Sequence, residues 1–163
     1  MPNGVPVTIP KHIASKGGYI RSAEDGDVPY LVENLRPEDK DEIKSASGLE
    51  TEEGLQNAVD IGALVGTNDE GPWVIWGHIP NNSDLTSVWC LATTQLAQHR
   101  SGFLRVSRLW LASLPYPRLN CFTDSRNKEH HRWLKFMGFK RSGEPKYFYD
   151  PTVEFHEYIR KDV

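Results

Sequence analysis

Strand-like patterning in the middle of the chain is the feature that most constrains its fold. Residues 63–67, 73–79 and 87–93 are rich in β-branched and aromatic side chains, and short turn sequences at 68–71 and 80–84 separate them. Turns this short join neighbouring strands of opposite direction. The three segments therefore predict an antiparallel meander.

Helical periodicity dominates the chain before this meander. Residues 19–22 form a short predicted strand, and apolar residues then recur at helical spacing over 28–35. Two further helices are predicted over 36–46 and 51–61, each opening with acidic residues and each followed by a glycine. Three helices are therefore expected between the first strand and the meander.

The remainder of the chain mixes both periodicities. A long helix is predicted over 97–114, where a Pro-Tyr-Pro sequence ends it, and a strand over 118–123 follows. A short helix over 128–137 precedes two strands, over 140–149 and 153–160. This order predicts a mixed α/β (α+β) domain with a largely antiparallel twisted sheet flanked by helices, and it excludes a doubly wound nucleotide-binding sheet.

The length of 163 residues suits one domain, which we place at residues 19–163. Residues 1–18 contain three Pro and three Gly and have no sustained periodicity, so they are interpreted as an arm that precedes the domain. Such an arm either docks on a partner or is disordered.

The composition excludes several classes of partner. Nineteen basic against 22 acidic residues give a net charge of −3, which does not suit bulk nucleic-acid binding. No run of about 18 apolar residues is available to span a membrane, and the first residues lack the apolar core of a signal peptide. Cys90 and Cys121 both lie in apolar stretches, as expected of reduced, buried thiols and not of a disulfide or a metal site. We expect a cytoplasmic protein with no metal, nucleic-acid or membrane partner.

The segment from Asn127 to Phe139 carries the most specific local signal. An Asn follows a strand, a short helix comes next, and Gly138-Phe139 ends it. This combination resembles the signature of the GCN5-related N-acetyltransferase (GNAT) family, and the order of elements over residues 19–160 is similar to the GNAT fold. The resemblance implies that Asn127 contacts the pantetheine or phosphate region of acetyl-coenzyme A. The alternative is that Gly138 is a helix C-cap and Phe139 a core residue, with or without a reaction.

The resemblance also implies where the cofactor binds. Members of the family hold its pyrophosphate on backbone N–H groups at the start of the long helix, where small residues and the helix dipole favour an anion. The matching stretch is 98–104, in which Gly102 fits the first glycine but Leu104 occupies the second small position and opposes the closest approach of the phosphates. The cofactor-binding residues that the resemblance implies are Leu91, Ala92, Thr93, Gln98, His99, Arg100, Ser101, Gly102, Phe103 and Asn127.

An N-acetyltransferase needs a base that takes a proton from the attacking amine. The candidates are His78, Asp124 and the pair His130 and His131. Their alternatives are a half-buried sheet residue, a helix N-cap and an exposed helix face, respectively. Many family members also use a Tyr as acid, seven residues after the Asn, but this chain has Leu134 there. Adjacent helical residues point about 100° apart, so the His pair does not suggest a metal site.

A wider pattern, over residues 94–110, 116–119 and 124–127, is similar to the acetyltransferase-like proteins of tailed bacteriophages, which are associated with internal virion or morphogenesis functions. Two functions follow. The first is acetyl-CoA-dependent transfer of an acetyl group to an amine or protein acceptor in the host cytoplasm, which Gly102 and the signature Asn favour. The second is a catalytically inactive virion component or host-protein binder, which Leu104 favours. An enzyme that uses another acyl group would differ only in its pocket lining.

Overall fold

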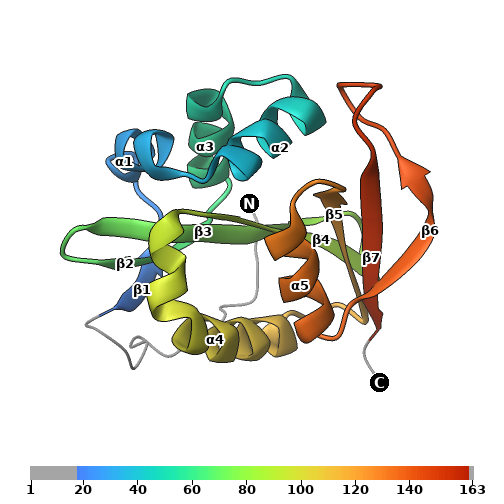
Figure 1. The fold of residues 1–163 in the computed structure, drawn as a ribbon. Helices are drawn as coiled ribbons and strands as arrows, with labels where there is room; N and C mark the ends of the chain where they lie inside the picture. Colours follow the sequence, from blue (N-terminus) through green and yellow to red (C-terminus); the bar gives the residue numbers. More distant parts are fainter. Residues whose placement is uncertain (1–17, 162–163) are drawn as a thin grey trace.

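The computed structural model describes residues 18–161. The predicted arm over residues 1–18 lies outside the described residues apart from Gly18. One seven-stranded sheet with flanking helices forms the described part (Figure 1). Its strands are β1 (Tyr19–Ser22), β2 (Leu64–Asn68), β3 (Gly71–Pro80), β4 (Leu85–Ala92), β5 (Arg118–Asp124), β6 (Lys140–Lys146) and β7 (Phe155–Lys161). Its helices are α1 (Asp27–Asn34), α2 (Pro37–Ser47), α3 (Thr51–Asp60), the 3₁₀ helix η1 (Thr94–His99), α4 (Arg100–Ser113) and α5 (Lys128–Phe136).

The sheet order is β1-β2-β3-β4-β5-β7-β6, and every neighbouring pair is antiparallel except β4 and β5. The predicted meander is therefore present as β2, β3 and β4, and the predicted α/β class with a largely antiparallel sheet is confirmed. Among residues 18–161, no helix has the length and hydropathy needed to cross a bilayer.

The parallel pair β4–β5 is short. It spans only Leu85–Ser87 against Arg118–Asn120, after which the two strands no longer pair. Each strand continues with its other neighbour, β3 or β7. The carboxyl-terminal halves of β4 and β5 are therefore splayed, and their facing backbone groups are not used by the sheet.

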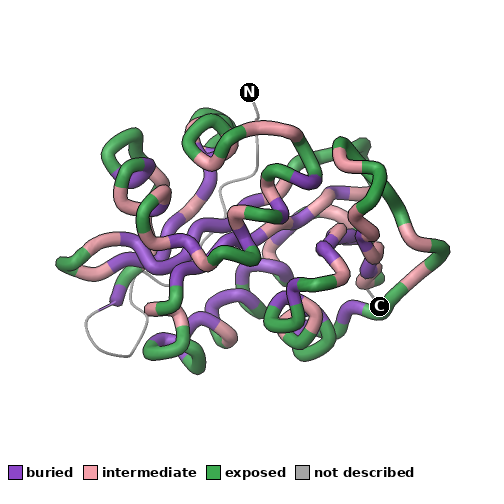
Figure 2. The backbone as a smooth tube through the Cα atoms, turned by 45° about the horizontal axis from the view of Figure 1, so that its top comes forward, coloured by how far each residue is buried: buried purple, intermediate pink, exposed green. Residues whose placement is uncertain are grey.

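Helices cover both faces of the sheet. Figure 1 shows α1, α2 and α3 together on one side and α4 on the other. Apolar side chains of β4 alternate accordingly: Leu91 packs with α1 and α3, whereas Cys90 and Ala92 pack with α4 and α5. In Figure 2 the central strands are largely buried, whereas β6 at one edge and the outer surfaces of the helices are mostly exposed.

Two predicted boundaries differ from the structure. The long helix does not begin at residue 97: η1 begins immediately after β4, because the side chain of Thr93 accepts a hydrogen bond from the Gln95 N–H at 3.2 Å and starts a turn there. The sixth strand ends at Lys146 and not at 149. Phe148 leaves the sheet and packs edge-on against Phe122 and Phe155, with ring centroids 5.2 and 5.0 Å apart.

Helix α2 has clear sequence determinants and positions two residues of the site. Pro37 lies in its first turn with Glu38 and Asp39, as favoured by the helix dipole. Gly48 ends it with a left-handed φ of 75°. A Cβ at Gly48 would also lie 2.6 Å from the Tyr149 ring, so this helix end admits only glycine beside the β6–β7 connection.

Candidate functional site

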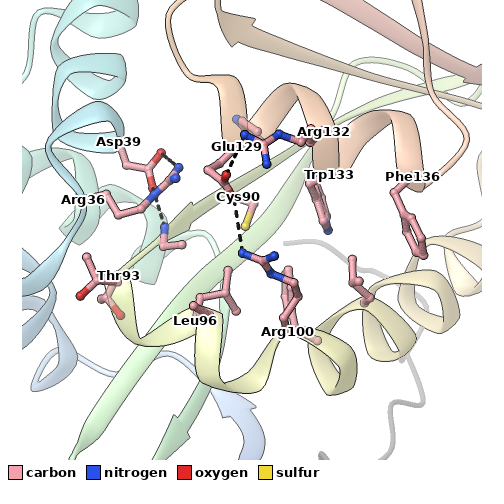
Figure 3. A pocket seen from close by; sticks show the side chains of 16 residues that line it. Arg36, Asp39, Cys90, Thr93, Leu96, Arg100, Glu129, Arg132, Trp133 and Phe136 are labelled. Atoms are coloured by element: carbon pink, nitrogen blue, oxygen red, sulfur yellow. Dashed lines mark hydrogen bonds and ion pairs between the residues drawn. The ribbon is translucent and has the colours of Figure 1, made fainter.

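Two cavities lie on opposite sides of the splayed strands. Cavity A, of about 410 Å³, is bounded by the end of β4, by η1 and by α4 and α5 (Figure 3). Cavity B, of about 680 Å³, is bounded by α2, α3, β4, β5 and the β6–β7 connection. Cys90 and His130 line both cavities. These two residues therefore lie where a group held in one cavity comes closest to a group held in the other.

His130 is held by a chain of hydrogen bonds that ends at a carboxylate. Its Nδ1 lies 2.8 Å from the Thr123 hydroxyl, which donates to Glu42 Oε1 at 3.1 Å. Because the hydroxyl has one hydrogen and gives it to Glu42, the bonding pattern assigns the hydrogen of the His130–Thr123 bond to Nδ1. His130 is 6% exposed, and its Nε2 is buried without a hydrogen-bond partner among the described residues.

The surroundings of His130 set its basicity. Burial lowers its pKa. The charge of Glu42, whose Oε2 lies 3.6 Å from Nδ1, and the hydrogen bonds that His130 makes to Cys121 and Glu42 together outweigh burial. The net effect raises the pKa well above the usual value of 6.5. An imidazole with Nδ1–H directed to this relay presents Nε2 as a proton acceptor, which is the requirement for a general base.

A second buried network joins α2 to β4 and α5. Asp39 Oδ2 accepts the Ala92 N–H at 2.8 Å, and Oδ1 accepts Asn127 Nδ2 at 2.8 Å and Arg36 at 3.1 Å. Arg36 also donates to Asn127 Oδ1 at 3.0 Å. Arg36 and Asp39 line one end of cavity A, as Figure 3 shows.

This network changes the roles expected for Asn127 and for the end of β4. The Asn127 side chain is 1% exposed, and both its amide groups bond Asp39 or Arg36. Ala92 is engaged on both sides, since its carbonyl accepts the Arg36 N–H at 3.0 Å. The expectation that Asn127 and the Ala92 backbone are available to a ligand therefore needs correction, because α2 already satisfies them.

The backbone of β4 offers other groups. Thr93 N–H donates to the carbonyl of Trp73 on β3 at 3.0 Å, and Leu91 pairs with Ile75, which also lies on β3. Peptide groups alternate along a strand, so those of Thr93 and Leu91 face β3 and those of Cys90 face the splayed gap. The β4 backbone groups that remain available to a ligand are therefore those of Cys90, and not those of Leu91–Thr93 as expected.

The predicted phosphate loop is divided between surface and core. Gln98, Arg100 and Ser101 are exposed, and Gly102 and Phe103 are buried. His99 is 2% exposed and stacks on Trp73 with ring centroids 4.3 Å apart, so its ring is part of the core and only its backbone can face a phosphate.

Three charged side chains meet at the mouth of cavity A. Arg100 on α4 and Arg132 on α5 both pair with Glu129, at 3.6 and 3.2 Å. Figure 3 shows the Arg100–Glu129 pair reaching across from α4 to α5. All three side chains line the cavity and are at least 46% exposed, so solvent screens these pairs. The mouth carries a net positive charge.

Two of the predicted base candidates lie away from these cavities. His78 hydrogen bonds to Thr86 at 2.9 Å and lines a separate cavity of about 220 Å³, and burial lowers its pKa. Asp124 is buried at the end of β5, where its carboxylate accepts the N–H and guanidinium of Arg126. Burial raises the Asp124 pKa, but these bonds outweigh it and lower the pKa below the usual range.

His131, the neighbour of His130, is also engaged elsewhere. Its ring nitrogens bond the Tyr158 hydroxyl at 2.7 Å and the Asp124 carbonyl at 3.1 Å. Only His130 among the base candidates lines cavities A and B. The sequence did not single out Glu42, Thr123, Asp39, Arg36 or Cys90, because nothing local distinguishes them from ordinary helix or strand residues.

Comparison with known proteins identifies the fold. No protein-family model matches the chain, and no curated protein matches it. Among solved structures, Ard1 from Thermoplasma volcanium has a TM-score of 0.65 at 13% identity, covering 91% of this chain and 99% of that one. A GNAT-family acetyltransferase from Bacillus cereus has a TM-score of 0.60 at 15% identity, covering 91% and 99%. YncA from Salmonella typhimurium, solved with its cofactor acetyl-CoA, has a TM-score of 0.61 at 11% identity, covering 90% and 94%. The chain therefore has a GNAT-like fold, as its sequence predicted.

Proposed function

We propose that the protein is an acetyl-CoA-dependent N-acetyltransferase that binds acetyl-CoA in cavity A and acetylates an amine presented from cavity B. The observation that carries this proposal is the position of His130, whose buried Nε2 has no partner in the described structure and whose ring lines both cavities. The GNAT-like fold, shared with a protein solved with acetyl-CoA, supports the same reaction.

The residues of cavity A fit this cofactor. Leu96, Phe103 and Trp133 offer apolar walls to a pantetheine arm, and the Cys90 peptide groups face the gap where its amides would lie. Arg100 and Arg132 supply positive charge near the start of α4, where the helix dipole also favours an anion. We assign the pyrophosphate to Arg100–Gly102, with Leu104 beside the arm and not under the phosphates.

Acetyl-CoA supplies an activated acyl group, and this chain supplies position and a base. His130 Nε2 accepts the proton that leaves the amine nitrogen as its bond to the acyl carbon forms. The Thr123–Glu42 relay stabilises the resulting imidazolium. Leu134 is fully buried and provides no acid, so the thiolate that leaves takes its proton from His130 or from water.

Isothermal titration with acetyl-CoA tests the cofactor assignment. We expect micromolar binding by the wild type. Arg100→Glu should weaken it by at least about tenfold because a carboxylate repels the pyrophosphate. Arg105→Glu, an equal charge change at an exposed residue of α4 that does not line cavity A, is the matched control and should bind almost normally. Absence of binding at millimolar acetyl-CoA would overturn the proposal.

A second function is favoured by a specific observation, namely that Arg36 and Asp39 occupy both groups of the Asn127 side chain. This arrangement suits a catalytically inactive virion component or host-protein binder, for which the titration would show no acetyl-CoA binding. The resemblance of residues 94–127 to tailed-phage proteins supports a phage origin and a phage or host acceptor in the host cytoplasm, as part of either proposal.

A further inference from the structure

We infer that the acceptor is a primary amine carried on an aromatic or aliphatic body, bound in cavity B with its nitrogen directed at His130. This inference rests on the proposed acetyl transfer and adds the chemical class of the acceptor. It follows from three properties of cavity B: its walls, its charge and its connection to His130.

The walls of cavity B carry apolar side chains from three directions, beside a smaller number of polar ones. Ile43 and Leu49 belong to the α2 side, and Trp89 and Leu91 come from β4. Phe122, Phe148 and Phe155 form an aromatic group on the opposite side, in which the Phe148 ring contacts the other two edge-on. A hydrocarbon or aromatic body buried there loses contact with water and gains contacts with these side chains.

The aromatic group is held close to α2 by the β6–β7 connection. Asp150 N–H donates to the Ser45 carbonyl at 3.0 Å, and the Tyr149 ring lies over Gly48. Figure 1 shows this connection next to the end of α2. The structure thus has a defined aromatic wall there, and a ligand body need not form it on binding.

The charges of the two cavities are opposite. Cavity A is lined by Arg36, Arg100 and Arg132 against the carboxylates Asp39 and Glu129, so its net charge is positive, as suits a phosphorylated ligand. Cavity B is lined by the carboxylates Glu42 and Asp60 and by no Lys or Arg. An amine is a cation at neutral pH, so cavity B attracts its charged form and disfavours acidic ligands.

The amine reaches the base from this side. His130 lines cavity B, and its Nε2 is more than nine-tenths buried and lacks a partner in the part of the chain described. Glu42 lies beside it in the same wall. An ammonium group in cavity B therefore meets the carboxylate that attracts it. It loses one proton to solvent to become the neutral amine, and the His130 imidazole accepts the second proton as the nitrogen–acyl bond forms.

Extended polyamines do not fit this description. They carry several charges along their length, and the apolar walls would leave those charges without partners. We therefore expect 2-phenylethylamine to be acetylated with a kcat/KM at least about 100-fold above that of spermidine. The assay follows thiol release from acetyl-CoA and confirms the acetylated amine by mass. A short peptide with an amino-terminal Phe presents the same chemistry and shows whether a free amine or a chain end is preferred.

Two substitutions of opposite charge at one position test whether the charge of cavity B governs acceptor binding. Ala46 is an exposed residue of α2 that lines cavity B. Ala46→Arg should raise the KM for 2-phenylethylamine about tenfold, and Ala46→Glu, of similar bulk, should raise it less or lower it. Ala112→Arg, at an exposed position of α4 that lines neither cavity, is the control and should leave the KM unchanged.

The outcomes separate this inference from the proposed function. All these variants should retain the wild-type Kd for acetyl-CoA, which titration measures independently of catalysis. Preference for spermidine, or equal KM values for Ala46→Arg and the wild type, overturns the acceptor class while acetyl transfer stands. Failure of the wild type to bind acetyl-CoA overturns the proposed function.

Discussion

Two buried histidines of this protein have opposite environments. The His99 ring stacks on Trp73 in the core, 2% exposed, and lines neither cavity. The His130 ring lines both cavities, and only its Nδ1 side is engaged, through Thr123 and Glu42. The residue type alone does not separate these cases. The difference arises from which neighbours the fold places at each ring nitrogen.

Replacement of His130 tests its assignment as the base. His130→Gln should lower kcat by about 100-fold, the usual contribution of a positioned general base, with little change in the Kd for acetyl-CoA. His78→Gln, outside both cavities, is the control and should keep near-wild-type kcat. Steady-state kinetics and titration measure these values. A kcat for His130→Gln within twofold of wild type would remove His130 from the reaction.

The pH profile depends on Glu42. Its charge raises the pKa of His130, so its removal should lower that pKa. Because His130 must be neutral to accept a proton, the acid limb of kcat/KM in Glu42→Gln should move to lower pH. The thiols of Cys121 on β5 and Cys90 on β4 also lie near His130. Both are present in Glu42→Gln as in the wild type, so they do not account for a difference between the two profiles. An acid limb that stays in place or moves to higher pH contradicts the relay.

Among the elements, α2 organises the site although no base lies on it. Its Asp39 binds β4 through Ala92 and α5 through Asn127, and its Glu42 binds the end of β5 through the Asp124 N–H at 2.8 Å. These bonds attach the first helical layer to both splayed strands. Helix α2 therefore sets the geometry of the gap in which the reaction is proposed.

Loss of the Asp39 carboxylate should loosen this attachment. Asp39→Asn leaves Arg36 without its ion-pair partner beside a buried network, which should lower the free energy of unfolding by about 2 kcal/mol. The control Asp41→Asn, at an exposed position of the same helix, should change the free energy of unfolding by less than about 0.5 kcal/mol. Urea denaturation compares the two, and equal stabilities would show that the network contributes little.

At the scale of the whole molecule, acid should weaken the fold through carboxylates held by arginines. Asp27 on α1 accepts two bonds of 2.8 Å from Arg21 on β1, and these bonds, against the effect of burial, lower its pKa below 3.8. A carboxyl with a depressed folded-state pKa contributes stability above its unfolded pKa and loses it as pH falls through the folded value. This contribution is therefore complete at pH 6 and declines below about pH 4.

A variant isolates this contribution. Arg21→Gln removes the interaction that depresses the pKa, so the loss of unfolding free energy between pH 6 and pH 3.5 should be smaller in Arg21→Gln than in wild type. Urea denaturation at both pH values gives the difference. His130 is the same in the wild type and the variant, so its contribution cancels in this comparison. An equal or larger loss in the variant would show that Asp27 does not contribute in this way.

The sequence predicted the elements better than the site. The meander, the helices on either side of it and the class of the sheet follow from local periodicity, so they were recovered. Boundaries near Thr93 and Phe148 were missed because a side-chain cap and an aromatic contact set them. Of the predicted site residues, His130 and Arg100 line the cavities, whereas the His99 ring packs in the core, and local sequence does not separate these two outcomes.

The amino-acid sequence by itself determined the order of strands and helices, because hydrophobic period, turn residues and helix ends act over a few neighbouring positions. Only the tertiary structure decided which polar groups remain available to a ligand. Asn127 is bound by a carboxylate 88 positions away, and the hydroxyl that bonds His130 donates to a carboxylate 81 positions from it. Hydrogen bonding and desolvation depend on distance in space, and the splayed strands bring these residues together.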